Sequence, residues 1–232
     1  MMNINGLQKL TLLDYPGRVA CTVFLAGCNM RCPWCHNSEF IEQDAEVVMD
    51  DDELIRFLKG RTGILDGVAI TGGEPLFRRD LPELLKRIKD LGYSIKLDTN
   101  GSFPDRLKEI TDAGLVDYIA MDIKNDPSRY GITVGFPGEY DLTAIKKSIR
   151  IIMESGIDYE FRTTVVKELH DEDSFRGIGE LIKGAGKYFL QCFVDRDTVV
   201  YSGLSAPSKE DLERYAEIMK DYVESVDIRG VE

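Results

Sequence analysis

Residues 19–37 read VACTVFLAGCNMRCPWCHN and contain both the start of the fold and the most informative motif of the chain. The first eight residues, Val19 to Ala26, are mostly apolar or β-branched, which predicts a buried strand. The loop that follows carries three cysteines in a C-x3-C-x2-C spacing: Cys28, Cys32 and Cys35. This order, strand first and cysteine loop second, predicts a metal centre at the carboxyl end of the strand.

The number of cysteines in the loop predicts the kind of metal centre. Three thiolates can hold three irons of a cubane iron–sulfur cluster, and no fourth cysteine lies nearby, so one iron is left open for a ligand. An open corner can bind and transform a substrate, whereas a closed site transfers electrons or stabilises the fold. Cys21 and Cys192 lie within predicted strands and are expected to be core thiols.

The sequence leaves two other uses of these thiols open. A zinc site usually brings a second pair of cysteines or histidines, and neither His36 nor the distant His170 supplies that spacing. A disulfide is disfavoured because five cysteines is an odd number and residues 1–6 lack the basic region of a signal peptide. Iron and sulfide analysis of anaerobically purified protein distinguishes iron from zinc.

Composition limits the class of protein. With 232 residues, 43% of them hydrophobic, the chain can bury a substantial core, and we expect one domain over residues 1–232. The net charge of −12 argues against a nucleic-acid partner. No apolar run reaches the roughly 20 residues that a bilayer requires, so we expect no membrane association and a cytoplasmic location.

Strand-like and helix-like segments alternate along the rest of the chain, which is typical of parallel βαβ units. After residues 19–26, the predicted strands are 67–71, 94–97, 118–123, 159–166 and 188–194. The predicted helices are 50–58, 80–91, 104–113, 142–154, 173–183 and 209–223. These segments make about six βα units, and they predict an α/β barrel.

Polar and glycine-rich motifs follow the ends of these strands. TGGEP (71–75) follows the second strand, DTNG (98–101) the third, and MDIK (121–124) ends the fourth. Arg162 lies within an apolar strand, where an uncompensated guanidinium would be costly, so we expect it to face the barrel mouth and meet an anion. In a barrel of parallel strands these ends gather on one rim, where active sites lie.

Taken together, these motifs resemble a known family. The segments LTLLDYPG (10–17) and FLAGCNMRCPWCHN (24–37), with the aromatic Trp34 before the third cysteine, are similar to those of radical S-adenosylmethionine enzymes that activate glycyl-radical enzymes. The chain most resembles the activators of anaerobic ribonucleoside-triphosphate reductase, over nearly its whole length. The resemblance implies a partial (β/α)6 barrel over residues 19–224, with an N-terminal extension (1–18) and a C-terminal tail (225–232).

The resemblance also implies the cofactors and the residues that hold them. Cys28, Cys32 and Cys35 are expected to carry a [4Fe–4S] cluster whose open iron is chelated by S-adenosylmethionine. Gly72, Gly73 and Glu74 are expected to hold the methionyl ammonium of that cofactor. The alternative for these three residues is a tight turn with a solvated glutamate.

The other strand-end residues are expected to surround the same cofactor. The resemblance implies a monovalent-cation site formed by Asp98, Thr99 and Asp122, and a contact between Lys124 and the ribose. The alternative is an Asp–Lys ion pair that only stabilises the barrel.

The remaining expected contacts involve the anion and the adenine. Arg162 is expected to meet the cofactor carboxylate or a carboxylate of the fold. His36 is expected to contact adenine or to be an exposed loop histidine, and Trp34 to lie in the cofactor site.

The implied function is an oxidoreductase activity used under anaerobic conditions. The enzyme would cleave S-adenosylmethionine reductively and install a glycyl radical on anaerobic ribonucleoside-triphosphate reductase, with a flavodoxin- or ferredoxin-type electron donor. Other candidates are an activator of a formate lyase, an enzyme acting on a small molecule such as a deazapurine precursor, and a zinc or electron-transfer protein without radical chemistry.

Overall fold

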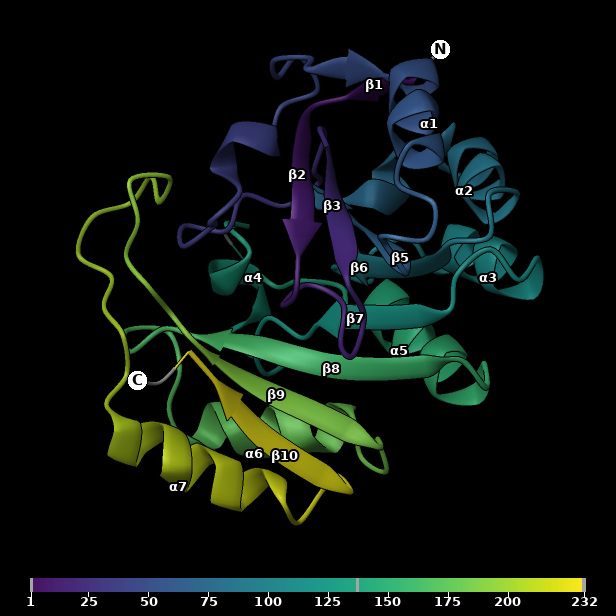
Figure 1. The fold of residues 1–232 in the computed structure, drawn as a ribbon. Helices are drawn as coiled ribbons and strands as arrows, with labels where there is room; N and C mark the ends of the chain where they lie inside the picture. Colours follow the sequence, from purple (N-terminus) through teal and green to yellow (C-terminus); the bar gives the residue numbers. More distant parts are fainter. Residues whose placement is uncertain (1, 137, 231–232) are drawn as a thin grey trace.

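The computed structural model of the chain describes residues 2–136 and 138–230 and contains one large curved sheet (Figure 1). Its eight strands follow the order β10-β9-β8-β7-β6-β5-β3-β2. All neighbours from β3 to β10 are parallel, and β2 is antiparallel to β3. The strands are β2 (Gly6–Thr11), β3 (Ala20–Leu25), β5 (Gly67–Gly72), β6 (Ser94–Thr99), β7 (Tyr118–Asp122), β8 (Asp158–Val165), β9 (Lys187–Cys192) and β10 (Ser225–Arg229).

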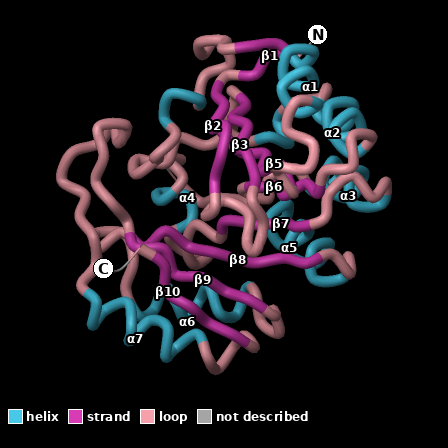
Figure 2. The backbone as a smooth tube through the Cα atoms, in the orientation of Figure 1, coloured by secondary structure: helices cyan, strands magenta, loops and turns pink. Residues whose placement is uncertain are grey.

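Helices connect the parallel strands and follow the outside of the curved sheet (Figure 2). They are α1 (Asp51–Lys59), α2 (Leu81–Lys89), α3 (Pro104–Asp112), α4 (Tyr130–Thr133), α5 (Thr143–Glu154), α6 (Glu172–Leu181) and α7 (Lys209–Met219). Every strand and helix predicted from the sequence is present, and the predicted α/β barrel of parallel strands is confirmed. α7 ends earlier than predicted because the chain turns after it, where the Gly184 amide donates to the Tyr222 carbonyl (2.8 Å).

The core lies between the sheet and these helices. In α2, the residues Leu81, Leu84, Leu85 and Ile88 are all buried, as their helical spacing predicts. α1 begins at a capping box, in which the Asp50 carboxylate accepts from the Glu53 amide (2.8 Å). The apolar faces of the helices thus cover the outside of the sheet, which leaves its inner face for polar side chains.

Both ends of the chain contribute strands that the sequence pattern did not indicate. Residues 225–232 were expected as a tail, and instead contain β10, which pairs with β9. Residues 1–18 contain β2 and also β1 (Asn3–Ile4), which pairs with β4 (Met49–Asp50). β2 carries exposed residues at its centre, so the alternation that marks a half-buried strand is weak there.

The strand order has β2 and β10 at its two ends, so within the described residues the barrel is open between them. Across the same ranges, no helix combines the length and apolar composition that crossing a bilayer requires.

Candidate active site

A cavity of about 440 Å³ lies at the carboxyl ends of the central strands. Every site residue expected from the sequence lines it: Cys28, Cys32, Trp34, Cys35, His36, Gly72, Gly73, Glu74, Asp98, Thr99, Asp122, Lys124 and Arg162. The topology therefore brings together motifs that are spread over more than half of the chain. What each residue does toward a ligand stays a prediction.

Backbone hydrogen bonds fix the cysteine loop against its neighbours. The Gly27 amide donates to the Phe40 carbonyl and the Cys28 amide to the Ile41 carbonyl, both at 2.9 Å. Gly27 has φ +103°, and a Cβ there would lie 2.9 Å from the Phe77 ring. A side chain at this position would therefore displace the loop that carries the thiols.

The three loop thiols suit a cluster. All five cysteines of the chain are free. Burial raises the pKa of the Cys32 thiol to about 12, and burial also raises the pKa of Cys28 and Cys35. Thiolates here need a positive partner, which bound iron supplies. In residues 2–136 and 138–230, no three His, Cys, Asp or Glu side chains converge as ligands of a single ion. Separate free thiols around one cavity fit a cubane, in which each binds a different iron.

The glycine turn after β5 packs directly on the cysteine loop. Gly72 has φ +122°, and a Cβ there would lie 2.3 Å from the Leu25 carbonyl oxygen. The Gly73 amide donates to that same carbonyl (2.9 Å), and the Glu74 amide donates to the Gly27 carbonyl (2.8 Å). Only glycine allows this approach, which sets the turn beside the thiols.

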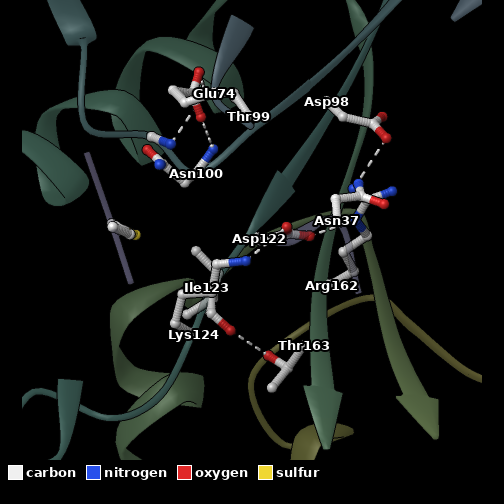
Figure 3. A network of polar contacts seen from close by, with 12 residues as sticks. Asn37, Glu74, Asp98, Thr99, Asn100, Asp122, Ile123, Lys124, Arg162 and Thr163 are labelled. Atoms are coloured by element: carbon white, nitrogen blue, oxygen red, sulfur yellow. Dashed lines mark hydrogen bonds and ion pairs between the residues drawn. The ribbon is translucent and has the colours of Figure 1, made fainter. Parts of the chain in front are cut away.

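The Glu74 carboxylate is buried and already hydrogen-bonded within the protein. It accepts from the Leu76 amide (3.0 Å), the Thr99 hydroxyl (2.9 Å) and the Asn100 amide (2.6 Å), as Figure 3 shows in part. Burial raises the pKa of Glu74 to about 7, although these hydrogen bonds oppose the rise. The solvated glutamate of the alternative interpretation is therefore excluded, because only 1% of the residue is exposed.

Two aspartates and three cations alternate across β6, β7 and β8. Figure 3 shows Asp98, Asp122, Lys124 and Arg162. Asp98 is paired with the Lys96 ammonium and, at 3.1 Å, with the Arg162 guanidinium. Asp122 is paired with Arg162 and, at 2.8 Å, with the Lys124 ammonium. Burial is the largest effect and disfavours ionisation, but Arg162 together with Lys96 at Asp98 and with Lys124 at Asp122 outweighs it and lowers the pKa of both carboxyls. Arg162 thus meets carboxylates of the fold, one of its two expected partners.

These carboxylates are paired with cationic side chains of the protein, and the expected monovalent-cation site stays a prediction. The four oxygens of Asp98 and Asp122 each accept a hydrogen bond or ion pair from a cationic side chain. Thr99, the third expected ligand, turns its hydroxyl to Glu74 instead. A bound cation would have to share these carboxylate oxygens with the protein's own positive groups.

His36 connects the cysteine loop to the long loop after β9. Its Nε2 lies 2.8 Å from the Val194 carbonyl oxygen, and its ring stacks on Phe193 with centroids 5.4 Å apart. The Ser38 hydroxyl donates to the Thr198 carbonyl beside it. His36 therefore has a role in closing one side of the cavity, and its contact with adenine stays a prediction.

Trp34 is buried between the cavity and a small apolar cluster that contains Val166 and Phe193. The Lys124 ammonium lies 4.8 Å from its ring centroid, within the range of a cation–π interaction. Its indole N–H is buried and has no hydrogen-bond partner among the described residues.

Two site residues were missed from the sequence. Lys96 lies within an apolar strand, the same signal that identified Arg162. Asn100 belongs to a recognised motif, and its side-chain amide donates to the Asn29 side chain (3.0 Å) and lies 3.9 Å from the Cys28 sulfur. The Asn29 partner of Asn100 depends on the tertiary fold, whereas Asp98 lies two residues from Lys96 on the same strand face, a spacing that the sequence does show.

Comparison with known proteins identifies the family. Residues 22–175 match the radical SAM superfamily. The chain belongs to this superfamily. A protein of Methanocaldococcus jannaschii named as a glycyl-radical enzyme activating enzyme, MJ1227, is 31% identical over 238 residues, covering 98% of this chain and 96% of that protein. The 7-carboxy-7-deazaguanine synthase of Thermococcus kodakarensis is 28% identical over 197 residues, covering 75% of this chain and 74% of the synthase.

Solved structures show the same fold. Streptococcus suis SuiB bound to the precursor peptide SuiA superposes with a TM-score of 0.70 at 14% identity, covering 91% of this chain and 48% of SuiB. This radical SAM chain therefore spans about half the length of SuiB. Membership of the superfamily implies a [4Fe–4S] cluster and S-adenosylmethionine as cofactors.

Proposed function

We propose that this radical SAM enzyme installs a glycyl radical on a partner enzyme, and that the partner is an anaerobic ribonucleoside-triphosphate reductase. The observation that carries the proposal is the 31% identity to a relative named as a glycyl-radical enzyme activating enzyme, over nearly the full length of both chains. Three free thiols at one cavity agree with it.

The cluster would be held by Cys28, Cys32 and Cys35. When bound, the cluster and S-adenosylmethionine supply one-electron cleavage of the sulfonium, which yields a 5′-deoxyadenosyl radical able to take the α hydrogen of a glycine. The electron would come from a flavodoxin- or ferredoxin-type donor.

The side chains of the cavity would bind and orient the cofactor. Gly72 and Gly73 line the cavity, and their backbone carbonyl groups would accept from the methionyl ammonium. Arg162, Lys124 and Lys96 carry three positive charges against the two negative charges of Asp98 and Asp122, which favours an anionic carboxylate beside them. The partner's glycine loop would close the open side and exclude water from the radical.

Electron spin resonance tests this function. Holoprotein, dithionite, S-adenosylmethionine and a purified anaerobic reductase are incubated without oxygen, and a doublet signal on the reductase is expected. The Cys32→Ser variant serves as the matched control and should give no signal. If the wild type forms 5′-deoxyadenosine but gives no doublet with any glycyl-radical enzyme, including a formate lyase, the activase function is wrong.

A second candidate is an enzyme that acts on a small molecule, favoured by the 28% identity to a 7-carboxy-7-deazaguanine synthase. A deazapurine precursor would then stimulate 5′-deoxyadenosine formation in stoichiometric amounts, and the reductase would not. Failure to form 5′-deoxyadenosine at all would support the zinc or electron-transfer alternative.

A further inference from the structure

Asp98 and Asp122, which line the cavity, are paired at every carboxylate oxygen with a cationic side chain of the protein. Lys96 and Arg162 hold the two oxygens of Asp98, and Arg162 and Lys124 hold the two oxygens of Asp122. The network therefore contains three fixed cations and two carboxylates, a net charge of +1. A further cation would raise that positive charge, which is unfavourable.

Lys96 is the member of the network for which no expected contact with a cofactor or cation has been described. Only 2% of its side chain is exposed, compared with 10% for Lys124 and 14% for Arg162. Lys96 and Asp98 are two residues apart on β6, so both side chains point to the same face of the sheet. The Lys96 ammonium donates to Oδ1 of Asp98, the oxygen that Arg162 does not hold.

A buried lysine in this position is held by more than one negative charge. Glu160 of β8 is fully buried. Burial alone would raise the pKa of its carboxyl, but two arginines and, to a smaller extent, the charge of Lys96 lower it. Asp98 and Glu160 lie in the same row of the sheet, because both are in register with Ala120 of β7, so Lys96 is influenced by both carboxylates.

We infer that the Lys96 ammonium is a built-in replacement for a monovalent cation, so that S-adenosylmethionine binding by this enzyme does not depend on added potassium or sodium. The inference rests on the proposed cofactor site, since it assigns Lys96 a positioning role there. By holding one oxygen of Asp98, Lys96 leaves Arg162 oriented toward the cavity.

Cation exchange tests the inference on the anaerobic holoenzyme. The dissociation constant of S-adenosylmethionine is measured by equilibrium dialysis in potassium, sodium or tetramethylammonium chloride. The wild type should bind equally well in all three salts. Lys96→Ala should bind about tenfold more weakly in tetramethylammonium, because Asp98 loses a partner, and potassium or methylammonium should restore most of the affinity.

Thallium-205 resonance gives a second readout that does not depend on the cofactor or on any partner enzyme. Thallium, as a potassium substitute, should show specific broadening with Lys96→Ala and none with the wild type. The matched control is Lys89→Ala, which removes a similar lysine from a half-buried ion pair with Asp117 (2.7 Å), outside the cavity. If the Lys96→Ala variant unfolds, the same measurements are made on Lys96→Met, which retains the apolar part of the side chain.

The outcomes separate this inference from the proposed function. Wild-type binding that requires potassium, or specific thallium binding by the wild type, overturns the inference. A Lys96→Ala variant with lower stability but no salt dependence also overturns it, because the lysine would then be merely structural. Absence of a glycyl radical on every partner would contradict the activase function and leave these binding results unaffected.

Discussion

Glu74 shows how one buried residue can organise a site without being free to bind a ligand. Its carboxylate joins the turn after β5 to the loop after β6 through the Leu76 amide, the Thr99 hydroxyl and the Asn100 amide. Asn100 in turn lies beside Cys28. Glu74 therefore connects the turn after β5 to the cysteine loop. Its contact with the methionyl ammonium stays a prediction.

Glu74→Ala should lower both stability and cofactor affinity. Three donors would lose their acceptor, at a cost of about 2 to 3 kcal/mol in the free energy of unfolding. Urea unfolding and S-adenosylmethionine titration measure the two effects. Glu83→Ala, which removes an exposed glutamate of α2, is the matched control and should change neither. Unchanged cofactor binding by Glu74→Ala would remove Glu74 from the site.

Gly73→Ala tests the contact between the same turn and the cysteine loop. A Cβ at Gly73 would lie 2.5 Å from the carbonyl oxygens of Gly27 and Phe40, which are backbone atoms of the cluster loop. Overpacking of this kind costs about 1 to 3 kcal/mol and should shift the thiols. We expect less iron per chain after anaerobic reconstitution. Gly60→Ala, where the nearest atom is 3.4 Å away, should load iron normally.

Among the connecting elements, the turn between β8 and α6 is held by a buried histidine. The Val166 amide donates to Nδ1 of His170 (3.1 Å), so Nε2 carries the proton and donates to the Lys124 carbonyl (2.9 Å). The turn is thereby fixed to the end of β7, next to Asp122. Burial lowers the pKa of His170, although its hydrogen bonds oppose the shift.

This lowered pKa predicts how stability changes with pH. Below about pH 6.5 the unfolded chain protonates His170, while the folded chain keeps it neutral down to its lower pKa. The wild type should therefore lose stability as the pH falls from 7.5 to 5.5, and His170→Gln should lose less over that interval. Urea unfolding at both pH values measures the difference. Equal losses in the two proteins would contradict the assignment.

The edge strand β10 is held by an ion pair as well as by its backbone hydrogen bonds to β9. Arg229 donates to both oxygens of Glu160 in β8 (2.8 and 2.9 Å), and the Tyr118 hydroxyl donates to the same carboxylate (2.8 Å). Glu160 is fully buried, whereas 35% of the Arg229 side chain is exposed.

Arg229→Met should destabilise the protein by about 2 kcal/mol, below the value for a wholly buried pair because Arg229 is partly exposed to solvent. The double variant Glu160→Gln/Arg229→Met should lose less than the sum of the two single changes, since no buried charge is left unpaired. Additive losses in urea unfolding would show that the pair does not hold β10.

At the scale of the whole molecule, periodicity predicted the six βα units because each buries a regular apolar face, as α2 does. It missed β2 and β10, whose pairing depends on neighbours distant in sequence. For the site, strand-end position brought every expected residue to one cavity. The partners of Glu74 could not be predicted, because hydrogen bonds between different loops leave no spacing signal, whereas Lys96 and Asp98 have the i, i+2 spacing of one strand face.

The open side of the barrel suggests where a partner would enter. A second cavity, of about 510 Å³, lies between β2 and the loop after β9, and shares Gln8, His36 and Arg196 with the main cavity. Glu39 lines this second cavity, which we call the outer cavity, and does not line the main cavity. A glycine loop that follows this path would pass Glu39 before it reaches the thiols.

Glu39→Trp should therefore reduce activation of the partner without weakening cofactor cleavage. The indole would narrow the outer cavity, so the KM for the partner enzyme should rise about tenfold, while 5′-deoxyadenosine formation without partner stays near that of the wild type. Asp44→Trp introduces the same bulk and charge change at an exposed position that lines neither cavity, and should behave as the wild type. Normal partner activation by Glu39→Trp would rule out this route, because a loop entering there could not avoid the added ring.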